Sequence, residues 1–500
     1  MNDFSPVRNR KIFITIKKIF IFFILSVFAS QCFSESQSTT AEEAEDPSLR
    51  YLRTLNSVFS YVQQNYVDDV DPKILYEGAL KGMMEALGDP YTVYLNTDDM
   101  RDLTDTTKGN FGGVGLSITK PVSSTPENPA YVEVASPIED TPGAKAGIQS
   151  GDFITTIDDK PTPEMTMQEV LANLRGKIGT SVKVSILRGK DISFSVSLVR
   201  ALIEVPTVKY GMINDTGYLR IIEFTPDTPK RVQDAIDSFE KNQYTGLIID
   251  LRNNPGGLIT SVTAVADKFI DDGPVVSTKS RLSFENTVMT ASKSKTVVPQ
   301  NIPIVVLINH GSASAAEILS GALKDNHRAY LIGERTYGKG SVQQVFPLRE
   351  QDGFKMTMAR YYTPSDTNID KVGIPPDLEI KDPEMSEEQQ KDYIEFINSG
   401  TIAGYVSSHP YMTEQDIKNY AEELSARYKF EPRLLRRLIR LECDRTTGAP
   451  LYDLDYDIQL NKALEIVKSS NYTKLVEATK TLKELQLAAE QASDISVLKK

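Results

Sequence analysis

The sequence is poor in the residues that build metal clusters and disulfide frameworks. Its 500 residues include only two cysteines, Cys32 and Cys443, and three histidines. Two cysteines cannot hold a chain of this length in a disulfide framework, and so few donors do not favour a histidine and cysteine metal site. We therefore expect no metal ion and no other cofactor.

The chain also lacks an excess of basic residues. It carries 56 basic against 68 acidic side chains, a formal net charge of −12. Because a protein that binds nucleic acid usually carries a basic excess, nucleic acid is not expected as a partner. The composition, 40% hydrophobic and 25% charged, is that of a globular protein, and the length predicts about three or four folded units.

Long apolar runs are absent except near the N-terminus. The run from Ile19 to Ala29, broken only by Ser26, follows five basic residues: Arg8, Arg10, Lys11, Lys17 and Lys18. This pattern is typical of a secretory signal, whereas a membrane-spanning helix takes about 20 apolar residues. We expect residues 1–34 to be a signal peptide and the protein to be exported to the periplasm or cell envelope. An uncleaved N-terminal membrane anchor and lipid attached to Cys32 stay open as alternatives.

Cleavage or lipid attachment at Cys32 would leave Cys443 without a partner. The mature fold would then not depend on a disulfide, even in an oxidising compartment. We expect Cys443 to be a buried small hydrophobic residue.

Composition and periodicity divide the rest of the chain. Residues 35–48 are acidic and lack large apolar side chains, so they predict a linker. Residues 49–109 have apolar side chains at helical spacing and predict a helical segment. Residues 201–384 alternate buried strands with helices, which indicates an α/β core with a largely parallel sheet. Residues 385–500 predict a C-terminal helical region.

Between these segments, residues 110–200 predict short strands around one helix at 167–174. The glycine loop at 112–116, the turn at 144–148 and the phrase at 151–154 together resemble a PDZ domain. Glycines at 113 and 115 let backbone N–H groups surround an anionic group, and the strand after them can accept an extended peptide. The resemblance implies peptide binding at Gly113, Val114, Gly115 and Leu116.

Two loops of the α/β core carry candidate catalytic residues. Ser314 lies in a turn of small residues between a buried strand and a helix expected at 315–325. A helix N-terminus places free N–H groups beside the hydroxyl, although a capping serine is the plainer interpretation. Lys339, flanked by glycines, lies in the loop after the next strand, and parallel strands bring both loops to the same sheet edge.

These residues resemble the carboxyl-terminal processing (tail-specific) peptidase family of Ser-Lys proteases. Ser314 matches its nucleophile, Lys339 its general base, and Gln343 the glutamine that supports the lysine. The resemblance runs from about Tyr51 to Ile380 and includes the phrase Asp89-Pro90-Tyr91. It implies an α/β serine-protease core joined to a PDZ domain.

The implied mechanism needs a neutral Lys339, whereas free lysine titrates near 10.4. Burial away from carboxylates would lower its pKa, and Gln343 could orient the amine without adding negative charge. The backbone N–H of Ala315 is one candidate oxyanion donor. The other lies at Gly256 or Gly257, and the sequence does not decide between them.

The expected function is that of an exported serine endopeptidase that binds the C-terminal end of protein substrates through its PDZ domain. Two alternatives remain, a PDZ scaffold without activity and a Ser-His esterase that uses His310. Asp325 lies 11 residues beyond Ser314, about 16 Å along one helix, and is expected to be structural. The C-terminal helices could form a homo-oligomer or recruit an adaptor.

Overall fold

The computed structural model describes residues 46–498, apart from 109, 122–123, 126–128, 139–140, 150, 190–191, 205, 382–386 and 448–449. The expected signal peptide, Cys32 and most of the expected linker lie outside the described residues. The chain divides into two units, Met1–Tyr76 and Glu77–Lys500. No helix in the described ranges combines the length and the apolar character that a membrane crossing needs.

In the first unit, most of the described residues are helical. Helix α1 (Pro47–Asn65) begins at Asp46, whose carboxylate accepts the Ser48 N–H, and a proline at its first position fits the helix start. Helix α2 (Pro72–Glu85) begins in this unit and ends in the second. Large apolar side chains of the first unit are exposed: Leu49, Tyr51, Leu52, Leu55, Val58, Tyr61, Tyr66, Val67 and Ile74.

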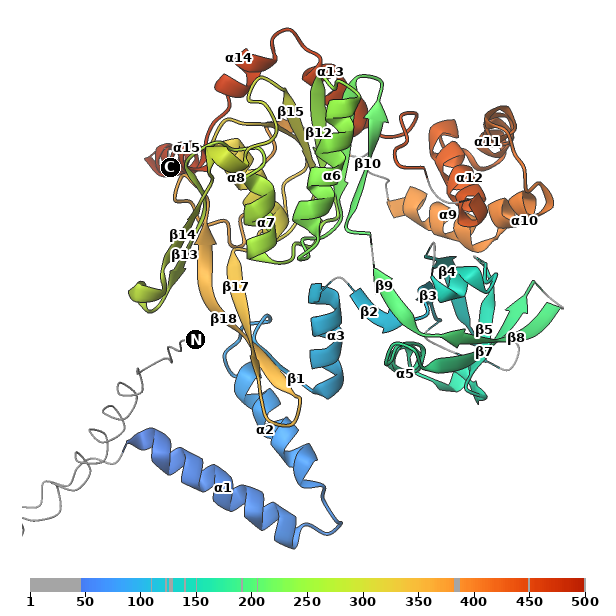
Figure 1. Ribbon diagram of the computed structural model, residues 1–500, viewed down its shortest axis with the longest axis vertical. Coiled ribbons are helices and arrows are strands. Elements are labelled where there is room, and N and C mark those ends of the chain that lie inside the picture. The colour runs from blue at the N-terminus through green and yellow to red at the C-terminus, as the bar shows by residue number, and fades with distance from the viewer. Residues whose placement is uncertain are drawn as a thin grey trace, which may run out of the picture. The chain divides into compact units, whose positions relative to one another are not determined.

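The second unit is built on a sheet with the strand order β10-β11-β12-β15-β16-β19. The β10–β11 pair is antiparallel and every other pair is parallel, so the largely parallel α/β core is confirmed (Figure 1). The strands are β10 (Val208–Ile213), β11 (Thr216–Ile221), β12 (Gly246–Asp250), β15 (Ile304–Ile308), β16 (Tyr330–Gly333) and β19 (Leu378–Glu379).

Helices cover both faces of this sheet because its strands are apolar on both sides. One face packs against α6 (Thr228–Lys241), α7 (Ile259–Ala266) and α8 (Ala315–Asp325), which lie side by side (Figure 1). The other face packs against α13 (Ile458–Val467), whose Leu460 and Ala463 are fully buried. Successive residues of β15 alternate between the two cores, as the period of a strand requires.

A second, antiparallel sheet was not expected from the sequence. Its order is β1-β18-β13-β14, and β17 pairs with β18. Because β1 comes from the segment expected to be helical, residues 49–109 also supply a strand. The strands are β1 (Val93–Leu95), β13 (Pro274–Ser280), β14 (Thr287–Thr290), β17 (Ser341–Pro347) and β18 (Gly353–Tyr362); helix α3 (Thr97–Lys108) follows β1.

The PDZ-like part has its own sheet and its own core. The strand order is β3-β4-β5-β7-β8, with β6 paired to β5, and the core is formed by side chains such as Val132, Ile154 and Val184. The elements are β2 (Asn110–Gly113), β3 (Leu116–Thr119), β4 (Val132–Pro137), α4 (Pro142–Lys145), β5 (Phe153–Ile157), β6 (Lys160–Pro161), α5 (Met167–Leu174), β7 (Ser181–Arg188), β8 (Ile192–Val199) and β9 (Ala201–Glu204).

The C-terminal residues do not form one separate helical region. Helices α9 (Glu387–Asn398), α10 (Thr401–Ser408), α11 (Glu414–Tyr428) and α12 (Pro432–Thr447) share a core of their own. The later helices α13, α14 (Tyr472–Glu477) and α15 (Leu482–Leu498) pack on the α/β core instead. The Tyr472 hydroxyl donates to the Ile304 carbonyl at 2.7 Å, and the Ile304 N–H donates back to it at 2.9 Å.

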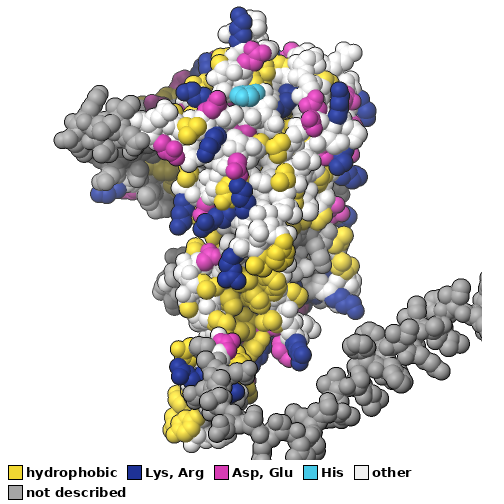
Figure 2. Space-filling view, turned by 90° about the vertical axis from the view of Figure 1, so that its left-hand side faces the viewer, with side chains coloured by type: hydrophobic (Ala, Val, Ile, Leu, Met, Phe, Trp, Pro, Cys, Tyr) yellow, Lys and Arg dark blue, Asp and Glu magenta, His cyan; other side chains and the backbone are white. Residues whose placement is uncertain are grey.

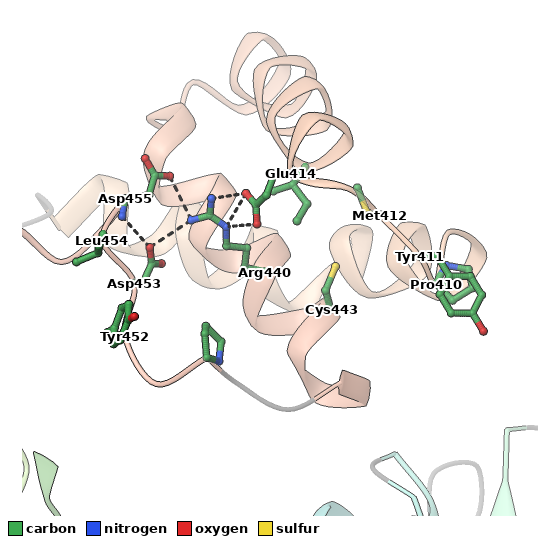
Figure 3. A pocket seen from close by; sticks show the side chains of 12 residues that line it. Pro410, Tyr411, Met412, Glu414, Arg440, Cys443, Tyr452, Asp453, Leu454 and Asp455 are labelled. Atoms are coloured by element: carbon green, nitrogen blue, oxygen red, sulfur yellow. Dashed lines mark hydrogen bonds and ion pairs between the residues drawn. The ribbon is translucent and has the colours of Figure 1, made fainter. Parts of the chain in front are cut away.

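Arg440 on α12 links the α9–α12 helices to the segment that precedes α13. Its guanidinium pairs with Glu414 on α11 and with Asp453 and Asp455 at 3.3 and 3.2 Å (Figure 3). These side chains line a cavity of about 750 Å³ that Cys443 also lines. Cys443 is only partly buried, so it is less buried than expected.

Hydrophobic and charged side chains are unevenly distributed over the surface. On the face drawn in Figure 2, hydrophobic side chains gather in one patch, and charged side chains of both signs cover the surface above it.

The packing of α13 leads to a stability prediction. Leu460→Ala removes a fully buried side chain from the sheet–helix core, so we expect it to lower the free energy of unfolding by about 2–5 kcal/mol. Urea denaturation measures this loss. The control is Leu487→Ala on α15, where the leucine is exposed. Equal stabilities of the two variants would contradict the assignment of α13 to the core.

Candidate active site

Ser314 occupies a strained turn between β15 and α8. Its backbone angles are φ 54° and ψ −115°, a region that side chains other than glycine rarely adopt. The Gly256 backbone lies directly against it, because a Cβ at Gly256 would be 2.7 Å from the Ser314 Cβ and 2.9 Å from the Ala315 nitrogen. Only glycine therefore fits at position 256.

Hydrogen bonds fix the 251–257 loop to the serine turn. The Ser312 hydroxyl donates to the Leu251 carbonyl at 2.8 Å, and the Ala313 N–H donates to the Asn254 carbonyl at 2.9 Å. The Asn254 side chain, which is fully buried, accepts the Gly256 N–H at 2.8 Å. The loop and the turn therefore form one hydrogen-bonded unit.

These hydrogen bonds distinguish Gly256 from Gly257 as the second candidate oxyanion donor. The N–H of Gly256 already donates to Asn254, whereas Gly257 lines the same cavity as Ser314. Gly257 forms a parallel bridge with Phe224 through the Gly256 carbonyl and the Leu258 N–H. In such a bridge the N–H of Gly257 points away from Phe224, so it is the better placed of the two to meet a ligand.

Glu317, in the first turn of α8, joins the serine turn to the lysine loop. Its buried carboxylate accepts four hydrogen bonds, from the N–H groups of Ser314 at 2.9 Å, Gly338 at 2.7 Å and Lys339 at 2.8 Å, and from the Thr336 hydroxyl at 2.5 Å. Burial raises the pKa of Glu317, and these hydrogen bonds oppose the rise. We did not assign Glu317 a role from the sequence, although its position three residues after a capping serine matches a capping box.

The candidate residues meet at one cavity of about 360 Å³. Ser314, Lys339, Gln343 and Gly257 line it together, and Glu223 adds a carboxyl whose pKa is raised by burial. Several of the other lining side chains are apolar: Leu103, Phe224, Leu258, Ile259, Ile318, Val342 and Val345. The cavity can therefore hold an extended, largely apolar peptide segment.

The surroundings of Lys339 favour its neutral form. Burial lowers the pKa of Lys339, and the positive charge of Lys355 on β18 acts in the same direction. The nearby Glu317 opposes them, so the lysine is not buried away from carboxylates as expected. The backbone carbonyl of Lys339 accepts the hydroxyl of Tyr361, which is almost fully buried.

Gln343 lines the cavity, but its amide N–H groups donate to Ser341 at 2.8 Å and to Thr357 at 3.3 Å. Among the hydrogen bonds of the described residues, none joins Gln343 to Lys339 or the Lys339 amine to the Ser314 hydroxyl. The support of the lysine by Gln343 therefore stays a prediction.

His310 and Asp325, the other two residues considered for a role beside Ser314, are not among the residues that line this cavity. His310 is exposed, with its ring centroid 5.6 Å from that of Tyr337. Asp325, at the end of α8, accepts the N–H groups of Ser365 at 3.0 Å and Leu482 at 2.8 Å. Asp325 thus ties α15 to the core, a structural role.

The expected peptide-binding residues run from the end of β2 to the start of β3. Gly115 has φ 74°, and a Cβ there would lie 2.2 Å from the Thr141 side chain. Val114 is buried, and Leu116 begins β3. Among the described strands, β3 stands at the edge of its sheet, and an edge strand can accept a peptide as an added strand.

The fold and this cavity define a serine-type peptidase core accompanied by a PDZ domain. The family model described as peptidase family S41 matches residues 215–380, and the PDZ domain model matches residues 133–188. The model of the activating protease CtpB N-terminal domain matches residues 14–99.

Curated relatives agree with these matches. A carboxy-terminal-processing protease of Bartonella bacilliformis is 38% identical over 396 residues, which cover 78% of this chain and 88% of the relative. The carboxy-terminal processing protease CtpA of Bacillus subtilis is 30% identical over 475 residues, 91% of this chain and 98% of the relative. The chain therefore belongs to the carboxy-terminal-processing proteases of peptidase family S41.

Among solved structures, a photosystem II D1 C-terminal processing protease aligns with a TM-score of 0.41 and 29% identity. The alignment covers 67% of this chain and 92% of that one.

Glu317→Gln tests the link between the two loops. An amide presents N–H groups where the carboxylate accepted hydrogen bonds, so at least one buried donor loses its acceptor. We expect the free energy of unfolding to fall by about 1–3 kcal/mol and cleavage to slow by about 10- to 100-fold. Urea denaturation and a protein-cleavage assay measure both effects. The control is Glu240→Gln at an exposed position on α6. A Glu317→Gln variant as stable and as active as this control would contradict the role of Glu317 in joining the two loops.

Proposed function

We propose that this protein is an endopeptidase that cleaves protein substrates with a Ser314–Lys339 dyad. The main support is the shared cavity, which holds a serine in a strained turn at a helix N-terminus and a lysine whose pKa is lowered by burial. A lysine with a lowered pKa can act as a general base near neutral pH.

In the proposed reaction, neutral Lys339 takes the proton of the Ser314 hydroxyl as the oxygen attacks the substrate carbonyl carbon. The N–H groups of Ala315 and Gly257 donate to the oxyanion that forms. When the intermediate collapses, the C–N bond breaks and the Lys339 ammonium gives its proton to the leaving amine. A water molecule, deprotonated by Lys339, then attacks the acyl carbon. The bond from this carbon to the Ser314 oxygen breaks, and the Lys339 ammonium returns the proton to that oxygen. Gln343 orients the amine in this scheme.

The PDZ domain selects the substrate by its C-terminal end. The loop of Gly113, Val114, Gly115 and Leu116 binds the terminal carboxylate through backbone N–H groups, and the edge of β3 pairs with the residues before it. Support comes from the position of β3 at the edge of the described sheet and from the positive φ of Gly115. Because backbone groups carry this recognition, an unfolded chain with an apolar tail is the expected substrate.

The cellular setting remains a proposal based on the sequence. The basic and apolar N-terminus supports export to the periplasm or cell envelope, with membrane association through the same segment. Helices α9–α12 have their own core and could form a homo-oligomer or bind an adaptor. Fractionation of cells that produce the full chain tests export, and sedimentation tests self-association.

Cleavage of an unfolded protein with an apolar C-terminus tests the dyad. Ser314→Ala and Lys339→Ala should each lower the cleavage rate at least about a thousandfold with folding retained, since each removes one partner of the proton transfer. The control Lys293→Ala, at an exposed position, should cleave normally. Unchanged substrate processing by Ser314→Ala would favour a scaffold, and loss of small-ester hydrolysis only in His310→Ala would favour an esterase.

The pH dependence of kcat/KM tests the electrostatic environment. Activity requires neutral Lys339, so it should rise as the pH passes through the pKa of this lysine. Because Lys355 lowers that pKa, Lys355→Gln should raise it and move the acid limb to higher pH by roughly half a unit. Lys355→Arg keeps the positive charge and should leave the limb in place. A limb that moves equally in both variants would contradict the electrostatic explanation.

A further inference from the structure

The segment Asp89-Pro90-Tyr91-Thr92, between α2 and β1, brings an aromatic ring to the proposed catalytic lysine. The Lys339 ammonium nitrogen lies 4.8 Å from the centroid of the Tyr91 ring. This distance is within the range of a cation–π interaction. The proposed reaction uses Lys339 but gives Tyr91 no part, and the ring faces the amine that must reach Ser314.

Several hydrogen bonds hold this segment in place. The Asp89 carboxylate accepts the Tyr91 N–H at 3.0 Å and the Thr92 hydroxyl at 2.6 Å. The buried Thr92 hydroxyl in turn accepts the Thr357 N–H of β18 at 3.1 Å. The side chain of Thr357 is an acceptor of the Gln343 amide. The ring and the proposed support of the lysine are therefore fixed to the same strand.

The phenol end of Tyr91 is also fixed. A hydrogen bond of the Tyr91 hydroxyl with the side chain of Tyr337, two residues before the lysine, is the main cause that raises the pKa of Tyr91 to about 12. The negative charges of Asp370 and Asp89 act in the same direction. Tyr91 consequently stays neutral over the working range of a protease, and the attraction for Lys339 comes from the ring face.

A ring face attracts an ammonium group but has little attraction for a neutral amine. The contact therefore favours protonated Lys339 and opposes the effects of burial and of Lys355. Among the other groups near the lysine, the charge of Glu317 also favours the ammonium form, but its oxygens accept hydrogen bonds from backbone and hydroxyl donors. Glu223 faces the cavity with a pKa raised by burial, and Tyr361 donates its hydroxyl to the lysine carbonyl.

We propose that Tyr91 is a positioning residue for Lys339, whose ring holds the ammonium form between turnovers and releases the amine to Ser314 when the lysine loses its proton. This inference rests on the proposed dyad. It accounts for the absence of a Lys339–Ser314 hydrogen bond among the described interactions, since the ammonium faces the ring.

The test is the pH profile of kcat/KM for cleavage of the unfolded protein substrate, from about pH 6 to about pH 10. Tyr91→Leu and Tyr91→Met keep an apolar side chain but remove the ring. Each should move the acid limb to lower pH by about half a unit, the size of an ordinary cation–π contribution. Tyr91→Phe keeps the ring and loses only the hydroxyl, so its limb should stay at the wild-type pH. Tyr411→Leu, at a highly exposed tyrosine, is the control for the effect of replacing any tyrosine with leucine.

The outcomes separate the two proposals. Movement of the limb in the leucine and methionine variants, but not in the phenylalanine variant, supports the inference. A loss of activity that is equal at every pH would overturn it, because a purely structural ring would act in that way. A limb that moves as far in Tyr91→Phe would also overturn it and assign the effect to the Tyr337 hydrogen bond. Full activity of Lys339→Ala would instead refute the dyad itself.

Discussion

The buried carboxylate of Glu317 is the interaction on which the geometry of the site depends. Ser314 and Lys339 come from loops that follow different strands, β15 and β16, and Glu317 accepts N–H groups from both loops. Burial of a carboxylate costs free energy unless its oxygens are hydrogen-bonded, and here four donors meet them. The same bonds that make the burial tolerable therefore set the separation of the two loops.

This arrangement creates an electrostatic conflict at the lysine. The negative charge of Glu317 favours the ammonium form of Lys339, whereas burial and the charge of Lys355 favour the neutral amine. Burial and the four hydrogen bonds to Glu317 act on the pKa of this carboxyl in opposite directions. A carboxylate that accepts backbone donors can thus join the loops, while burial and Lys355 keep the pKa of Lys339 below its ordinary value.

Local patterns predicted the elements that carry the proposed nucleophile. Helix α8 has the expected bounds because small residues and a serine mark its start, and the buried strands β12, β15 and β16 alternate with helices as expected. The antiparallel sheet was missed, since β17 and β18 are only partly buried and pair residues such as Gln343 and Thr357 without a clear apolar alternation. Tyr91 could not be placed near Lys339 from the sequence, because 247 residues lie between them and no local period reports that contact.

The C-terminal segment shows why a helical pattern alone does not define a domain. Arg252, next to the loop of Gly256 and Gly257, pairs at 2.6 Å with both Asp250 and Asp457. Burial alone would raise the pKa of Asp250, but the Arg252 guanidinium holds it below its usual range. Asp457 also accepts the Leu460 N–H at the start of α13.

A buried ion pair that loses one partner leaves a charge without compensation, which is costly. The 251–257 loop therefore depends on a residue about 200 positions later in the chain. This dependence couples the loop to α13, which packs on the sheet face opposite α8. One face of the sheet positions the serine and lysine loops, and the helix on the other face anchors the arginine at the base of the loop that is proposed to bind the oxyanion.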